Sequence, residues 1–583
     1  MRTLPPLHSQ SSPAFRRLAL LLLLFLVALG LRTFRAFQEP VVNPDTIRFI
    51  DQAKLLAVHP LLAVRQEVYH PLHSAAGLLV HTLIAGAFAN DRIAWLISMQ
   101  IVGILCGAIV ALQIVSLSRW IGAPFWAALG AGFVWTVGRR TSAFGADGLS
   151  DMLFLCLFTA AMLLGFRALR GFQRVCPRCL AAFLAAGLLG GLAYLARPEG
   201  LGAPLILAIT IVMLALPRPR RVGGPLRLAG RAFKLMPRIR PAPRLAALAM
   251  MALLLGAAIP SVPYMLAIGK FTAKLDEPTA RAPAAETLAA PAAMAAIVAE
   301  PHATLLHIGR LVMELWETFG FAPWLVLLLA LPLRPRLWGR ARLRLVVVVW
   351  AVLWIALMLW VLERKSYLDG RHTLALVVLL HGLLALALST WATAARYHGL
   401  RLRGRSPAWA ARVRNWGPMA GGTACFLAAL PGMIRLGTPP LNDQYYIARA
   451  AQWIKTHVRP NVTICDDELR IGYYSGHPYA LWEGLTIDPR LAELAEARRP
   501  GPGGQPHPIV AGEIYRPGNG DTPLSQIGPY VEIARFHSLA AAHGDVLVLY
   551  ARPEDHVMMD GDAAAAATGP ASAPAASTRE LAP

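Results

Sequence analysis

Charged residues are scarce in this chain of 583 residues: they make up 15% of the sequence, whereas hydrophobic residues make up 56%. A soluble domain of average composition carries about 25% charged residues. The sequence is therefore too apolar for a soluble fold, and its composition is typical of a protein that lies in a lipid bilayer.

Cysteine is also rare, with six residues scattered along the chain, so no disulfide framework is predicted. Three of the six lie in apolar runs, where cysteine commonly serves as a small buried hydrophobe. Cys176 and Cys179 form a single CxxC without a second pair or a nearby histidine, which makes a zinc site there a weak interpretation. No metal ligand is predicted.

Long apolar runs, in contrast, are abundant. A helix needs about 20 apolar residues to cross a hydrocarbon core of about 30 Å. Eleven spans are predicted, at residues 17–37, 93–118, 123–138, 151–168, 179–196, 201–216, 245–268, 319–332, 345–362, 372–395 and 417–436. Residues 75–89 are apolar but shorter and end at Asn90-Asp91-Arg92, so they are predicted to lie in the interface. A twelfth span there would invert the topology downstream.

Acidic residues are missing from every second loop of this arrangement. The N-terminal segment and loops 167–178, 217–244, 333–344 and 396–414 contain Lys or Arg but no Asp or Glu. Lys and Arg in short loops mark the cytoplasmic side. The formal charge of +23 is therefore expected to anchor the cytoplasmic face of a plasma or inner membrane rather than to bind nucleic acid. The N-terminus is expected in the cytoplasm, followed by an uncleaved first helix, because no small-x-small cleavage site precedes Leu31–Arg35.

The chain changes character after the last span. A helix is predicted at residues 445–458 and short strands at 462–465, 508–514 and 545–550. The predicted domains are a transmembrane domain (1–436), a small extracytoplasmic α/β domain (437–560) and a disordered Ala/Pro-rich tail (561–583). The expected fold is mainly α, a polytopic bundle of about eleven transmembrane helices with this α/β domain attached.

Carboxylates collect in the loops opposite the basic ones. Asn43-Pro44-Asp45 follows the first span, and a carboxylate placed just above the membrane can take a proton from an incoming hydroxyl or amine. A solvated loop aspartate is the alternative for Asp45 taken alone. After the third span come Asp147 and Ser150-Asp151, where Ser150 or Asp151 could cap the following helix instead of taking part in chemistry.

Arginines on this acidic side break the positive-inside pattern. Arg139 and Arg140 place two guanidinium groups in one loop, an arrangement that suits a phosphate. Arg197 lies in the turn Arg197-Pro198-Glu199-Gly200, and Arg371 follows Tyr367 in the turn that enters the tenth span. A side chain that snorkels from the lipid boundary is the alternative for each arginine. The topology nevertheless brings these three loops and the loop of Asp45 to one side, which favours a shared site.

Two histidines precede the interfacial run, in Tyr69-His70-Pro71-Leu72-His73. His70 and His73 could act as acid–base groups or as metal ligands. Proline in the first turn of a helix explains the local pattern without either role, because its missing N–H has no partner at that position anyway.

Together these motifs resemble the GT-C glycosyltransferases that use lipid-linked sugars, such as the protein O-mannosyltransferases and the lipid A aminoarabinose transferases. The resemblance covers most of the chain. It is carried by Asn43-Pro44-Asp45, Tyr69–Leu72, Ser150-Asp151, Arg197–Gly200, Tyr367–Arg371 and Ala450–Ile454. Many members carry Asp-Glu where this chain has Asp45-Thr46, so a role that needs paired carboxylates in this loop is in doubt.

The resemblance implies an enzyme, an inverting hexosyl- or pentosyltransferase of the GT-C type. It would move a sugar from a polyprenyl-phosphate donor to a cell-envelope lipid, glycan or protein on the outer face of the membrane. It implies that Asp45 is the catalytic carboxylate and that Asp147 or Asp151 positions the acceptor or an arginine. The implied donor-phosphate ligands are Arg139, Arg140, Arg197 and Arg371, and the implied substrate-binding residues are His70, Glu199 and Tyr367. No cofactor is implied, and a divalent metal is neither required nor excluded.

A transporter or flippase of lipid-linked sugars is the competing interpretation. Transporters place ionisable residues near the bilayer midplane, on broken helices. Here the interiors of the predicted spans are almost free of charge, and the acidic residues lie at the helix ends. This distribution favours an enzyme whose site lies at the membrane surface.

Overall fold

The computed structural model divides into two compact units, one made of Met1–Phe37 and Phe49–Thr438 and the other of Gln38–Arg48 and Pro439–Pro583. The structure describes residues 13–39, 41–66, 69–172, 177–216, 226–228, 231–233, 243–272, 301–330, 341–365, 368–401, 416–435, 444–459, 462, 464–466, 470–477, 479–481, 509–515, 526–527, 530–538 and 546–551. The predicted disordered tail (561–583) lies outside these residues.

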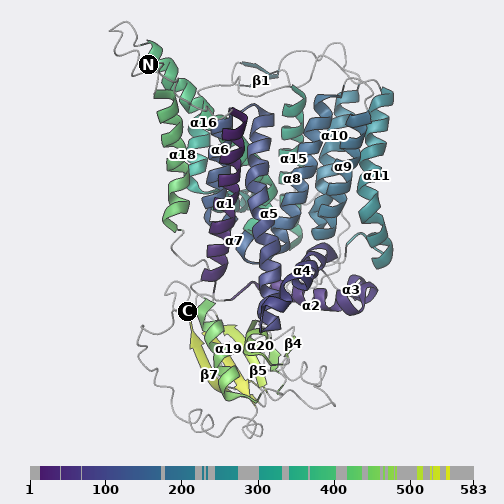
Figure 1. The fold of residues 1–583 in the computed structure, drawn as a ribbon, viewed down its shortest axis with the longest axis vertical. Coiled ribbons are helices and arrows are strands. Elements are labelled where there is room, and N and C mark those ends of the chain that lie inside the picture. Colours follow the sequence, from purple (N-terminus) through teal and green to yellow (C-terminus); the bar gives the residue numbers. More distant parts are fainter. Residues whose placement is uncertain are drawn as a thin grey trace, which may run out of the picture. The chain divides into compact units, whose positions relative to one another are not determined.

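The first unit is a bundle of long apolar helices (Figure 1). Within the described residues, eight helices are long and apolar enough to cross a membrane. They are α1 (Pro13–Gln38), α5 (Asp91–Ile121), α8 (Ser150–Arg170), α9 (Pro177–Ala196), α10 (Gly202–Ala215, with the preceding 3₁₀ turn η2, Pro198–Leu201), α11 (Pro243–Ile268), α15 (Ala341–Lys365) and α16 (Gly370–Arg401). The protein is therefore a multi-pass membrane protein.

Three further apolar segments complete the bundle. The helices α13 (Pro301–Phe319) and α14 (Phe321–Ala330) meet at a bend of 104° and form a ninth candidate span. The bend lies at Gly320, whose φ of 92° is readily adopted only by glycine. The helices α6 (Phe125–Val137) and α18 (Trp416–Ile434) are shorter and apolar. Each of the eleven predicted spans coincides with one of these helices, so the predicted fold class is confirmed.

Short helices gather at the end of the bundle where α1, α6 and α9 finish and α8, α10 and α16 begin. They are α2 (Pro44–Val58, of which Phe49–Val58 belongs to this unit), α3 (Pro60–Gln66), α4 (Pro71–Ile84) with the 3₁₀ turn η1 (Ala85–Ala87), and α7 (Arg139–Ala146). We call this the α7 end. Residues 43–53 and 139–147 were predicted as loops, and that prediction is wrong: they include α2 and α7, which are too polar to stand out as apolar runs.

Arginines also lie at the opposite end of the bundle. The guanidinium of Arg170, in the last turn of α8, lies 5.5 Å from the ring of Trp120 near the end of α5. The guanidinium of Arg17, near the start of α1, lies 5.8 Å from the ring of Phe125 at the start of α6. Most of the basic loops lie outside the described residues, apart from an antiparallel hairpin of β1 (Leu226–Leu228) and β2 (Arg231–Phe233).

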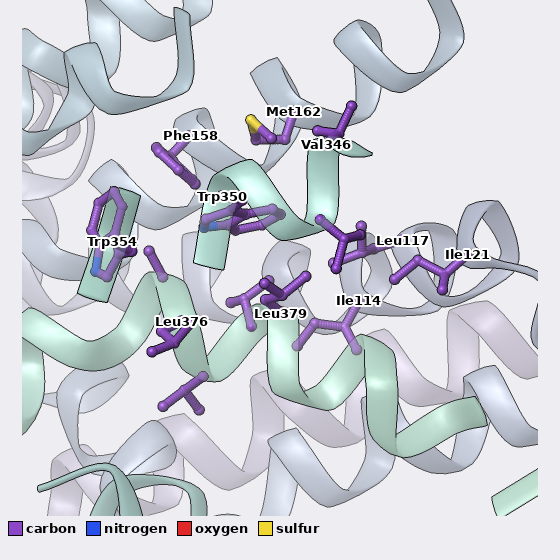
Figure 2. Packing of buried hydrophobic residues seen from close by; sticks show 14 of the residues in the cluster. Ile114, Leu117, Ile121, Phe158, Met162, Val346, Trp350, Trp354, Leu376 and Leu379 are labelled. Atoms are coloured by element: carbon purple, nitrogen blue, oxygen red, sulfur yellow. The ribbon is translucent and has the colours of Figure 1, made fainter. Parts of the chain in front are cut away.

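The core of the bundle lies where α5, α8, α15 and α16 pack together (Figure 2). Phe158 of α8 meets Trp350 and Trp354 of α15 edge-on, with ring centroids 5.4 and 5.1 Å apart, and Leu379 of α16 is buried in the same cluster. Lipid tails are as apolar as these side chains, so the helices associate through close packing rather than through the hydrophobic effect. Large interlocking side chains supply that packing here.

The helices α9 and α11 pack by a different device, the small residue. A Cβ atom added at Gly187 or Gly191 of α9 would overlap the carbonyl oxygens of Leu253 and Ala257 on α11. Two glycines four residues apart lie on one face of a helix and allow the backbones to touch, as is common in membrane proteins.

The second unit contains a mixed six-stranded sheet with the strand order β4-β3-β5-β8-β7-β6. The strands are β3 (Ile464–Asp466), β4 (Tyr479–Leu481), β5 (Ile509–Tyr515), β6 (Gln526–Ile527), β7 (Tyr530–His537) and β8 (Val546–Ala551). Strands β4, β3 and β5 are parallel, and the other neighbours are antiparallel. The helices α19 (Tyr445–His457) and α20 (Arg470–Ser475) pack against the sheet, which agrees with the predicted α/β character.

Candidate active site

Buried and partly buried ionisable side chains gather at the α7 end of the first unit. They come from the starts of α8 and α16 and from the turn between α9 and α10. A charge buried in a membrane protein is costly unless it is paired, and such groups commonly serve function. We call this set the polar cluster; its members are Asp151, Arg197, Glu199, Asp369, Arg371 and His372.

Arg197 bridges two carboxylates of the polar cluster. Its Nη1 donates to Asp151, while its Nε and Nη2 donate to the two carboxylate oxygens of Glu199 at 3.3 and 3.2 Å. The side chain of Arg197 is 7% exposed and that of Asp151 is 2% exposed. Arg197 is therefore no snorkelling anchor. Asp151 does not cap α8 either, because the N-cap residue is Leu149 and no side chain caps the helix.

The turn after α9 fixes Arg197 and Glu199 together. Pro198 starts η2, and the N–H of Gly200 donates to the carbonyl of Arg197 at 2.9 Å. A Cβ atom at Gly200 would overlap the backbone of Ala193 and Tyr194, so the chain can fold back this tightly only with glycine at that position. The fork of Arg197 then meets Glu199 in the bidentate geometry that guanidinium and carboxylate favour.

The start of α16 supplies the rest of the polar cluster. Nε of Arg371 lies 3.1 Å from a carboxylate oxygen of Asp369, and the indole N–H of Trp354 donates to the carbonyl of His372 at 3.1 Å. His372 lies within electrostatic range of Arg197, Glu199, Arg371 and Asp369. The two turns therefore form one cluster, although some 170 residues separate them in the sequence. Tyr367 lies outside the described residues.

Arg140 connects α7 to α13. Its guanidinium contacts Glu317 and lies 3.0 Å from Glu314, both on α13. A Cβ atom at Gly370 would lie 2.5 Å from Nη1 of Arg140, so this arginine also touches the start of α16. Asp369 acts electrostatically on Glu314, which extends the cluster to α13. Arg139 is exposed, and its side chain forms no ion pair within the described part of the chain.

His73 holds the loop that carries Asp147. The ring is fully buried, its Nε2–H donates to the carbonyl of Gly148 at 2.7 Å, and it meets Phe49 edge-on at 4.8 Å. Burial lowers the pKa of His73 to about 4, against a smaller opposing effect of the hydrogen bond to Gly148. The ring is therefore neutral at pH 7, and its hydrogen bond anchors the loop at Gly148. Asp147 itself is 9% exposed.

His70 lies at the N-cap of α4, and Pro71 occupies the first turn as predicted. Its Nε2 lies 3.0 Å from the hydroxyl of Thr272, and its ring packs on Tyr194 and Tyr264 at 4.9 and 5.0 Å. Within the described residues, no three His, Cys, Asp or Glu side chains are placed to hold a metal ion together.

Asp45 belongs to the second unit and lies in the first turn of α2. The side chain of Asn43 accepts the N–H of Asp45 at 3.0 Å, and the carbonyl of Asn43 accepts the N–H of Thr46 at 2.9 Å. Asn43 thus caps the helix, followed by proline at the first position, a common helix start. The Asp45 carboxylate is half-buried beside the positive end of the helix dipole.

This chain has the fold of the GT-C glycosyltransferases. The apo structure of ArnT from Cupriavidus metallidurans superposes with a TM-score of 0.52 and 13% identity over 92% of this chain and 98% of that chain. The Archaeoglobus fulgidus oligosaccharyltransferase tethered with an acceptor peptide gives a TM-score of 0.51 and 12% identity over 86% of this chain and 69% of that chain. No family model and no curated protein matches the sequence. At such identity the likeness establishes the fold, and function must be argued from the site.

Proposed function

We propose that this protein is a membrane glycosyltransferase that moves a sugar from a polyprenyl-phosphate donor to a cell-envelope lipid, glycan or protein on the outer face of the plasma or inner membrane. The observation that carries the proposal is the buried bridge of Asp151, Arg197 and Glu199 at one end of a bundle with the GT-C fold. Solved structures of ArnT with undecaprenyl phosphate and of AglB with a dolichol-phosphate support this class of donor.

Arg371 is the best-placed phosphate ligand in this proposal. Its side chain is 23% exposed and pairs with Asp369, which is itself 42% exposed, whereas Arg197 is 7% exposed between two carboxylates. A preplaced cation stabilises the charge that develops on a departing phosphate. Arg197 then serves to hold Asp151 and Glu199 beside that phosphate. Arg140, at 32% exposed and with two carboxylate partners, is the second candidate ligand.

Asp45 is the proposed catalytic base. Its carboxylate takes the proton of the acceptor's hydroxyl or amine as that group attacks the anomeric carbon. The bond from the anomeric carbon to the phosphate oxygen breaks, and the phosphate leaves with the electron pair. One displacement of this kind inverts the configuration at the anomeric carbon. The lipid phosphate is the leaving group, so the proposed reaction uses no nucleotide cofactor.

The variant Asp45→Asn tests the proposal. It should abolish formation of glycosylated product in proteoliposomes supplied with a labelled polyprenyl-phosphate sugar, while expression and membrane insertion stay unchanged. Asp91→Asn is the matched control, because that carboxylate is 68% exposed at the start of α5 and should be dispensable. Full activity of Asp45→Asn contradicts the assignment. Movement of labelled lipid across the vesicle membrane without any product identifies a flippase instead.

A further inference from the structure

The short segment Gln38–Arg48, which includes the first residues of α2, folds with the C-terminal residues rather than with the first unit. Val41 is fully buried in the hydrophobic core of the second unit, with Ile447 and Ile454 of α19 and Leu547 of β8. Val42 is 3% exposed. The residues directly before α2 are therefore buried within the second unit.

A hydrogen bond ties this segment to α20. The backbone N–H of Val42 donates to the phenol oxygen of Tyr474 at 2.9 Å, across 432 residues of sequence. A buried backbone N–H needs a partner, and Val42 lies before the helix, where no carbonyl of a helical turn is available. The hydroxyl of Tyr474 is therefore the group that holds this backbone in place.

The backbone between this hydrogen bond and Asp45 is closely constrained. Asn43 accepts the N–H groups of Asp45 and Thr46 through its side chain and its carbonyl. Pro44 has a fixed φ near −65°, which suits the first position of α2. Because Val42 is held and these turns are fixed, the Cα–Cβ bond of Asp45 points in a fixed direction.

We propose that Tyr474 is a positioning residue for the reaction, and that the second unit serves to hold the start of α2 so that Asp45 points in the productive direction. This inference rests on the proposed function, in which Asp45 is the base. A base must lie within about 3 Å of the proton that it takes, and a misplacement of about 1 Å can cost on the order of 100-fold in rate. Tyr474 acts only through Asp45 and contacts no substrate.

The variant Tyr474→Phe tests the inference, because it removes only the acceptor oxygen. We expect kcat to fall at least tenfold with the KM for the donor unchanged. We also expect faster hydrogen exchange in peptides that cover residues 41–47, with exchange in the sheet of the second unit unchanged. Tyr445→Phe is the control: its ring is 40% exposed at the start of α19, and both measurements should stay at the wild-type values.

Three results overturn the inference, each in a different way. Wild-type kcat and exchange in Tyr474→Phe, with Asp45→Asn inactive, show that this hydrogen bond does not position the base. Faster exchange across the whole sheet shows that Tyr474 stabilises the unit generally. Full activity of Asp45→Asn refutes the proposed function itself. The activity of Asp45→Asn therefore distinguishes this third result from the first two, in which that variant is inactive.

Discussion

Arg197 directs its three nitrogens at two carboxylates, and this arrangement limits what can replace it. Lysine would keep the charge but not the planar fork that meets Asp151 on one side and Glu199 on the other. The site therefore depends on the shape of the guanidinium as much as on its charge.

Replacing Arg197 with alanine should lower the free energy of unfolding by about 3–5 kcal/mol, because it leaves Asp151 as an unpaired buried charge. Arg197→Lys should recover part of this stability, yet transfer activity should stay more than tenfold below wild type. Unfolding in detergent and a product assay measure the two effects. Wild-type activity in Arg197→Lys would mean that the bidentate contact with Glu199 has no role in the reaction.

The lowered pKa of His73 should make the stability of the protein depend on pH. Its folded-state pKa of about 4 lies below the ordinary value of 6.5, so the unfolded chain binds this proton more readily. The free energy of unfolding should therefore fall as the pH is lowered from 6.5 to 4, by on the order of 3 kcal/mol. His73→Gln can still donate to Gly148 but does not titrate. Unfolding midpoints that drop equally in both proteins would exclude His73 as the source.

At the scale of elements, pairs of helices pack by two different means. The helices α8 and α15 interlock large rings, whereas α9 and α11 approach until their backbones touch at Gly187 and Gly191. Because η2 directly follows α9, the contact with α11 also supports the turn that presents Arg197 and Glu199.

Gly187→Ala should be destabilising, although alanine is the better helix former. Its Cβ would overlap the carbonyl oxygen of Leu253, and backbone cannot move aside as a side chain does. We expect a loss of about 1–3 kcal/mol, as for other overpacked interiors. Gly309→Ala on α13 is the control, because nothing lies within 4 Å of its added Cβ, and it should be neutral or stabilising. Equal unfolding midpoints for the two variants would contradict this account of the α9–α11 contact.

At the scale of the whole molecule, hydropathy predicts the bundle well because a bilayer demands long apolar helices. It misses α7 and α20, which are only eight and six residues long, and it also misses the strand β7. The charge pattern singled out Asp151, Arg197, Glu199 and Arg371, but not which of them pair. It also missed Glu314 and Glu317, although two acidic residues three positions apart in a largely apolar helix were a visible signal.

Labelling of single cysteines tests the predicted orientation. Arg227→Cys, in the basic hairpin, should react with an impermeant maleimide only after the cells are permeabilised. Asp91→Cys, at the exposed start of α5, should react in intact cells. The six native cysteines are first replaced with serine or alanine. The reverse pattern would place the polar cluster on the cytoplasmic side and remove the argument for an outer active site.

The bond from Val42 to Tyr474 also bears on how the protein is made. The ribosome adds Val42 to the growing chain 432 residues before it adds Tyr474. Until then the start of α2 has neither its hydrogen-bond acceptor nor the core that buries Val41. A nascent or truncated chain can thus insert its helices into the membrane while the start of α2 is still unheld, and this segment is fixed only after Tyr474 has been added.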